Sequence, residues 1–92
     1  MNFTIIAPCF NEEESIPDLV NQFSDLLKNR TNVKLLIVNN GSTDNSKEIL
    51  DRLCERESFL ESIHIEKNIG YGNGVVAGLR STKSEFVTWM YG

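Results

Sequence analysis

The 92-residue sequence contains few cysteines, few prolines and a single histidine. The two cysteines, Cys9 and Cys54, lack metal-ligand spacing, and two cysteines with one histidine make a zinc site improbable. The start of the chain has no basic and apolar signal segment, which predicts a reducing, cytoplasmic setting with free thiols. No apolar run approaches the length that spans a bilayer.

The sequence also lacks any block of like charge. The net charge is -4, and the lysines and arginines are scattered along the chain, so the sequence offers no electrostatic footprint for nucleic-acid or acidic-membrane binding. The hydrophobic share of 40% and the charged share of 24% are typical of a soluble globular protein. The length suits one small domain or part of a larger one.

Short apolar runs alternate with segments of helical periodicity. Strands are expected over 3–8, 33–38, 59–66 and 85–90, helices over 15–29 and about 44–57, and a glycine-rich turn entering a short helix over 70–82. The order β-α-β-α-β-α-β predicts an α/β fold with a Rossmann-like parallel sheet and helices on both faces. Ligands of such sheets bind outside the carboxyl ends of the strands, where this sequence places "PCFNE", "NNGS" and "EKN".

Two nucleotide-binding signatures can be tested against those strand ends. The Walker A loop is absent, and no glycine follows the first strand as the dinucleotide fingerprint requires. A G-x-G-x-x-A match at Gly72, Gly74 and Ala77 follows the third strand instead, and it alone supports a dinucleotide-binding oxidoreductase. The favoured interpretation is that these glycines permit a tight turn and close helix packing, with direct phosphate binding as the alternative.

Three segments together carry a resemblance to a known family. "APCFNEEESI", "IVNNGSTDNS" and "NIGYGNGVVAGL" resemble the family 2 glycosyltransferases of the GT-A fold, and the third looks most like the branch of the dolichyl-phosphate mannose synthases. The resemblance covers nearly the whole chain, with three motifs in order at the expected junctions. It implies that residues 1–92 are the amino-terminal, nucleotide-sugar-binding half of a GT-A domain.

The resemblance implies a set of nucleotide-binding residues. They are Pro8, Phe10, Asn11 and Glu12 in the first segment, Val38, Asn40 and Ser42 in the second, and Asn68, Gly70 and Gly74 in the third. In the first, Phe10 replaces the usual tyrosine of P-x-Y-N-E. In the second, both acids of the usual V-D-D-G-S-x-D are replaced, by Asn39 and Asn40. No catalytic or metal-binding residue is carried over, because the family's D-x-D motif and catalytic base follow the last strand and lie beyond this sequence.

The implied activity is transfer of a sugar from a nucleotide-diphosphate sugar to an acceptor such as a polyprenyl phosphate or a growing glycan. A divalent metal, Mg²⁺ or Mn²⁺, is expected in the whole enzyme, with its ligands outside this chain. Attachment to the cytoplasmic face of a membrane, where it occurs, is expected through segments outside this chain. These residues alone are expected to be inactive and to self-associate through an open sheet edge. The alternative is a non-catalytic Rossmann-like nucleotide-binding or interaction domain, which the loss of both acids favours.

The two asparagines after the second strand are expected to divide their roles. Asn39 would order the turn, because asparagine side chains readily bond nearby backbone groups, while Asn40 would face the nucleotide base. An amide offers one acceptor and one donor, which matches the N3–H and O4 of uracil better than the two N–H donors of guanine. A uridine nucleotide is therefore favoured over a guanosine one, and a cytidine nucleotide, which can also pair with an amide, is the alternative.

Overall fold

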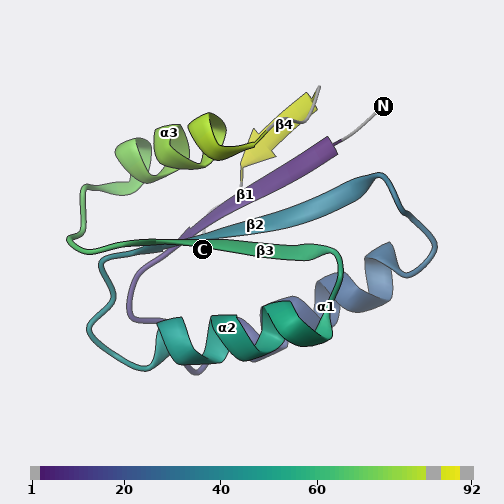
Figure 1. Cartoon of the computed structure of the whole chain (residues 1–92), viewed down its shortest axis with the longest axis horizontal. Coiled ribbons are helices and arrows are strands. Elements are labelled where there is room, and N and C mark those ends of the chain that lie inside the picture. The colour runs from purple at the N-terminus through teal and green to yellow at the C-terminus, as the bar shows by residue number, and fades with distance from the viewer. Residues whose placement is uncertain (1–2, 83–85, 90–92) are drawn as a thin grey trace.

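A computed structural model describes residues 3–82 and 86–89, which form a parallel sheet with helices on both faces (Figure 1). The elements follow one another as β1 (Phe3–Cys9), α1 (Ile16–Leu27), β2 (Val33–Asn40), α2 (Ser46–Arg56), β3 (Leu60–Ile65), α3 (Tyr71–Ser81) and β4 (Phe86–Trp89). The alternation predicted from the sequence is confirmed. Of the strand predicted over 85–90, the first and last residues lie outside the described ranges.

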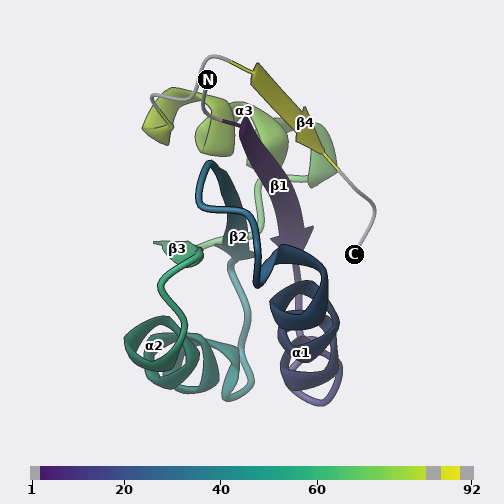
Figure 2. The same cartoon turned by 90° about the vertical axis from the view of Figure 1, so that its right-hand side faces the viewer.

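The four strands lie in the order β3-β2-β1-β4. Helices α1 and α2 cover one face of the sheet and α3 lies on the other (Figure 2). This division follows from right-handed crossovers: the chain steps from β1 to β2 to β3 in one direction and then returns across the sheet to β4. As a result, the loops after the neighbouring strands β2 and β3 leave toward opposite faces of the sheet. Ligands of such sheets bind in the crevice between two loops that diverge in this way.

The core has two layers, because β1 and β2 are buried on both faces. On the side of α1 and α2, the fully buried side chains are Ala7, Ile16, Val20, Leu35, Ile37 and Leu50. On the side of α3, Ile6 and Val38 are fully buried and Leu36 nearly so. None of the described helices is long and apolar enough to cross a bilayer.

Helix α3 approaches the sheet closely because a glycine faces the strands. A Cβ on Gly78 would lie 2.7 Å from Cγ2 of Ile6 and 3.2 Å from Cγ2 of Val38. The sequence predicted that Gly72 and Gly74 lie in a turn before this helix. The helix instead begins at Tyr71, and both glycines lie in its first turn. The turn glycine is Gly70, whose φ is 87°. Close packing by glycine is confirmed, but at Gly74 and Gly78.

We expect Gly78→Ala to lower the free energy of unfolding by about 1 kcal/mol. The added methyl group forces Ile6 to shift, at a cost of roughly 1–3 kcal/mol, which exceeds the gain of about 1 kcal/mol in helix propensity. Gly72→Ala is the matched control, since no atom lies within 4 Å of a Cβ there and the propensity gain stands alone. Urea unfolding of the two variants measures both effects, and an equal gain in stability at both positions would contradict the close approach.

Candidate functional site

Three loops meet at the carboxyl edge of the sheet, at the left-hand end of Figure 1. They are the β1–α1 loop (residues 10–15), the β2–α2 loop (41–45) and the β3–α3 loop (66–70). Polar side chains in these loops and at the end of β2 bond to the backbone of a neighbouring loop. The three segments that carried the family resemblance therefore form one connected surface.

The β1–α1 and β2–α2 loops are joined first through Asn11. Its backbone N–H donates to Oγ of Ser42 at 3.0 Å, and its Oδ1 accepts from the backbone N–H of Thr43 at 2.7 Å. Asn11 has a φ of 51°, a left-handed conformation that asparagine tolerates better than most residues. Asn11 thus bridges the two loops at a bend in the backbone.

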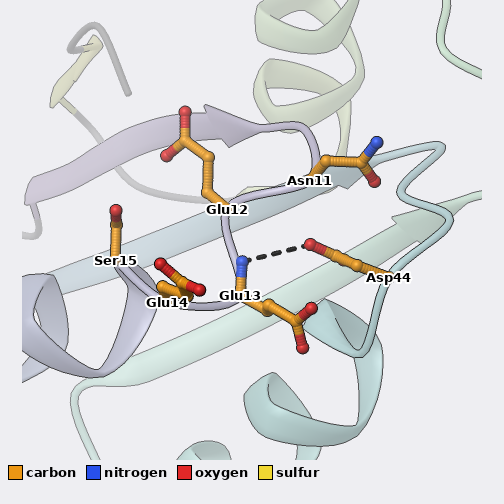
Figure 3. Close-up of a pocket in the computed structure, with 6 residues that line it drawn as sticks. All are labelled: Asn11, Glu12, Glu13, Glu14, Ser15 and Asp44. Atoms are coloured by element: carbon orange, nitrogen blue, oxygen red, sulfur yellow. Dashed lines mark hydrogen bonds between the residues drawn. The ribbon is translucent and has the colours of Figure 1, made fainter.

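Asp44 forms the second link between these loops (Figure 3). Its Oδ2 accepts from the backbone N–H of Glu13 at 3.2 Å, and its Oδ1 accepts from the backbone N–H of Ser46 at 3.0 Å, at the start of α2. Hydrogen bonding lowers the pKa of Asp44: the side chain of Ser46 contributes most, the backbone N–H groups of Ser46 and Glu13 contribute less, and burial opposes them. Asp44 thus connects the start of α2 to the β1–α1 loop.

The lowered pKa of Asp44 gives a pH-dependent prediction. A carboxyl group with a depressed folded-state pKa adds stability above its ordinary value of 3.8 and loses it as the pH falls through the folded-state pKa. We therefore expect Asp44→Asn to be less stable than the unmodified chain at pH 7, with the difference shrinking as the pH falls below 3.8. Thermal melts from pH 7 to pH 2.5 measure it, with Asp25→Asn on the exposed surface of α1 as control. A difference independent of pH would refute this role.

Asn40 joins the β2–α2 and β3–α3 loops. Only 3% of the residue is exposed. Its Oδ1 accepts from the backbone N–H of Ile69 at 3.1 Å, and its Nδ2 donates to the carbonyl of Gly70 at 3.0 Å. Gly74 lies directly above, where a Cβ would stand 3.0 Å from Nδ2 of Asn40. The oxygen and the nitrogen of the Asn40 amide each retain capacity for one further hydrogen bond.

Asn39 does not order the turn through its side chain, so that part of the prediction is wrong. Its Nδ2 lies 3.1 Å from Nδ1 of His64 on β3, because the parallel register pairs these two residues. The ordering role falls to Asn40, together with a backbone bond from the N–H of Gly41 to the carbonyl of Asn39. That Asn40 also faces a base stays a prediction.

The predicted site residues lie at different depths in this edge. Four of them are buried and form its floor: Pro8, Val38, Asn40 and Gly74. Glu12 and Ser42 are half-buried, and Phe10, Asn11, Asn68 and Gly70 are exposed. A cleft of about 450 Å³ opens between the loops, lined by Asn11, Glu12, Glu13, Glu14, Ser15 and Asp44. Figure 3 shows Glu12 and Glu13 pointing to opposite sides of the loop.

Two kinds of chemistry find no support among the described residues. Within 3–82 and 86–89, no three histidine, cysteine, aspartate or glutamate side chains gather as metal ligands. Burial, with a smaller contribution from Glu12, raises the pKa of the Cys9 thiol to about 12, so this thiol stays protonated and unreactive. Among the described residues, this edge therefore presents polar groups for binding, and its adjacent thiol is not reactive.

Comparison with known proteins places this edge in context. The family described as glycosyl transferase family 2 matches residues 4–90. An undecaprenyl-phosphate 4-deoxy-4-formamido-L-arabinose transferase of Yersinia enterocolitica is 30% identical over 86 residues, which are 91% of this chain and 26% of that protein. The chain thus spans about a quarter of the length of such curated relatives.

Solved structures share the fold. Residues 1–349 of TarS from S. aureus, in complex with UDP, superpose with a TM-score of 0.83 at 25% identity, covering 99% of this chain and 27% of that one. The mannosyltransferase PcManGT from Pyrobaculum calidifontis, in complex with GDP-Man and Mn²⁺, also gives 0.83, at 22% identity, covering 94% of this chain and 26% of that one. The predicted GT-A architecture is confirmed.

Proposed function

Since this chain belongs to the family 2 glycosyltransferases, we propose that its carboxyl edge holds the nucleotide of a nucleotide-diphosphate sugar. One observation carries the proposal: three loops at the ligand edge of the sheet are joined by the polar groups of Asn11 and Ser42 and, at the end of β2, of Asn40. Ligand sites on rigid, pre-formed surfaces lose less entropy on binding. The whole polypeptide would transfer the sugar to an acceptor.

Each level of the edge has a role in this proposal. The exposed ring of Phe10 and the backbone around Pro8 flank the base, and Glu12 reaches the nucleoside from the adjoining cleft. Ser42 and Asn11 lie next to each other at the junction of the first two loops. Val38 supports the floor, while Asn68, Gly70 and Gly74 shape it toward the sugar. We place the base beside Asn40, whose bonds to Ile69 and Gly70 stay in place, because the oxygen and the nitrogen of its amide each retain capacity for one further hydrogen bond.

We further propose that the nucleotide is of the uridine type and the acceptor a polyprenyl phosphate. The amide of Asn40 supports the first choice, because it cannot offer guanine two acceptors. Resemblance to the dolichyl-phosphate mannose synthase branch supports the second, as does the similarity to an undecaprenyl-phosphate transferase. Such an acceptor would place the polypeptide at a membrane surface, reached through segments other than these residues.

A divalent metal does not fit the described residues, which contain no cluster of ligands for it. Its place in the proposal is therefore outside them, in the D-x-D motif expected after β4. The alternative of a non-catalytic nucleotide-binding domain is favoured by one observation, the replacement of both family acids by Asn39 and Asn40. The glycosyltransferase and the non-catalytic domain would share the nucleotide site, but only the glycosyltransferase would turn over a nucleotide-sugar.

We expect the 92-residue chain to bind nucleotide weakly and to turn over no nucleotide-sugar. The edge contains no metal cluster, and its one adjacent thiol is protonated. The assay is release of UDP, CDP or GDP from a panel of nucleotide-sugars with Mg²⁺ or Mn²⁺ and a polyprenyl phosphate. A polypeptide of the relatives' length should be active in the same assay. Sustained transfer by the 92 residues alone would show that they already contain the catalytic groups.

A further inference from the structure

His64 is the single histidine of the chain and lies at the end of β3. The register places it beside Asn39 on β2, which is itself beside Cys9 on β1. Its Nδ1 lies 3.1 Å from Nδ2 of Asn39, and its Nε2 lies 3.1 Å from Oδ1 of Asp51 on α2. Asn39, His64 and Asp51 thus form a chain of polar contacts from the buried sheet edge to the surface.

The direction of these contacts follows from the chemistry of each atom. An amide nitrogen only donates hydrogen bonds, so Nδ1 of His64 accepts from Asn39 and carries no proton. A carboxylate only accepts, so Nε2 carries the proton and donates to Asp51. The two partners together select Nε2 as the ring nitrogen that carries the proton.

The buried oxygen of Asn39 makes this arrangement directional. Asn39 is 4% exposed, and its Oδ1 has no hydrogen-bond partner in the described structure. If Nδ1 carried a proton, Nδ2 and Nδ1 would oppose each other as two donors, and the amide would have to turn over to present Oδ1. The side chain of Asn39 is therefore matched to the protonation of His64.

We propose that His64 is a positioning residue for the nucleotide site: it orients Asn39 and thereby the end of β2 that carries Asn40. The carbonyl of Asn39 accepts from the N–H of Gly41 where the β2–α2 loop begins, and the next side chain joins the β3–α3 loop. A displacement of Asn39 is therefore transmitted to both loops. This inference rests on the proposed function, because it names what supports that site.

An ion pair between His64 and Asp51 alone would carry little weight, since their side chains are 25% and 55% exposed. The effect of His64 on the site therefore depends on its contact with the buried amide of Asn39. Once Nδ2 of Asn39 loses its acceptor, a desolvated donor is left without a partner, which is among the more destabilising changes available to a buried polar group.

The tautomer is tested first, without any nucleotide. With one histidine, ¹⁵N NMR of the imidazole at pH 7 reports this ring alone. We expect a proton on Nε2 and none on Nδ1. In Asn39→Asp, the new carboxylate needs a donor on its side while Asp51 needs one on the other, so both nitrogens should carry protons. A proton on Nδ1 alone in the unmodified chain would overturn the proposal.

Nucleotide titrations then test the positioning role. His64→Gln retains an acceptor and a donor in one side chain and should bind UDP within about twofold of the unmodified chain. His64→Phe retains bulk without polarity and should bind about tenfold more weakly, a factor equal to roughly 1.4 kcal/mol. If His64→Phe does not fold, the comparison of His64→Gln with Asn39→Asp replaces it, with Asn39→Asp expected to bind more weakly.

The two proposals fail in different ways. Equal UDP affinity of all folded variants would overturn the positioning role and leave the nucleotide site intact. A lack of UDP binding by the unmodified chain would overturn the proposed function and the positioning role together, while the tautomer result still reports the contact of Asn39 with His64.

Discussion

Replacing Gly41 by alanine should lower the free energy of unfolding by about 3 kcal/mol or more and remove nucleotide binding. A Cβ at this position would meet the backbone nitrogen of Asn68 and would lie 2.5 Å from the carbonyl carbon of Lys67. Gly41 also has a φ of 73°, which costs a residue with a side chain roughly 1–2 kcal/mol. Because the obstructing atoms belong to the backbone, the β3–α3 loop itself would have to move, at a further cost of about 1–3 kcal/mol.

Urea unfolding measures the loss of stability, and two further variants separate its causes. Asparagine tolerates a left-handed backbone, so Gly41→Asn reduces the conformational cost but retains the clash with Asn68. Gly72→Ala introduces the same methyl group where nothing lies within 4 Å, and should not destabilise the fold. If Gly41→Asn were as stable as the unmodified chain, the close crossing of the two loops would be disproved.

Asn40→Asp should cost about 3 kcal/mol at pH 7, because it removes a donor and introduces a charge at a site that is 3% exposed. One carboxylate oxygen can still accept from the N–H of Ile69, but the other would face the carbonyl of Gly70, which keeps only its bond from the N–H of Gly74. Protonation of the new carboxylate supplies an O–H donor and removes the repulsion between the two oxygens. The variant's deficit should therefore grow as the pH rises, since an acid that is harder to ionise in the folded state loses stability with rising pH.

Chemical denaturation at pH 4 and pH 7 measures the effect of Asn40→Asp. Asn45→Asp is the matched control: it makes the same chemical change at an exposed residue before α2, where the helix dipole favours a negative charge. A deficit equal for the two variants would rule out the buried bond between Asn40 and Gly70.

The same variant tests the choice of nucleotide. We expect the unmodified chain to bind UDP more tightly than GDP, and Asn40→Asp to shift the balance toward GDP, because a carboxylate pairs with guanine's two N–H donors. Calorimetric titration of UDP, CDP and GDP with divalent metal gives the ratio. Tighter binding of GDP by the unmodified chain would remove the uridine preference, as would an unchanged ratio in the variant.

The sequence predicted the elements of the fold well because their signals are local. Apolar runs such as that of β2 and the helical periodicity around Ile16 and Val20 need no knowledge of distant residues. The start of α3 was misplaced for the same reason. Glycine usually signals a turn, and only the proximity of Pro8 and Asn40, far away in sequence, shows why a glycine at position 74 is suited to the first turn of a helix.

The site was predicted less completely, because its bonds join residues about thirty positions apart in sequence. The motifs identified Asn11, Asn40 and Ser42 but not what holds them, such as the backbone of Thr43 and Ile69. The contact of His64 with Asn39 was within reach: aligning the ends of β2 and β3 as parallel neighbours pairs these residues. The bond from Glu13 to Asp44 had no comparable signal, since it depends on the bend at Asn11.

The central claim is that the three joined loops bind a nucleoside diphosphate, and NMR titration of the ¹⁵N-labelled chain with UDP tests it most directly. We expect fast-exchange shifts that saturate with a Kd on the order of 1 mM, equivalent to about 4 kcal/mol of binding free energy. The shifts should concentrate at Phe10, Asn11, Ser42 and Gly70, with little change at the opposite end of the sheet, around Thr31 and Ser58. Shifts confined to that opposite end, or no shifts at 10-fold higher UDP than this Kd, would contradict the account.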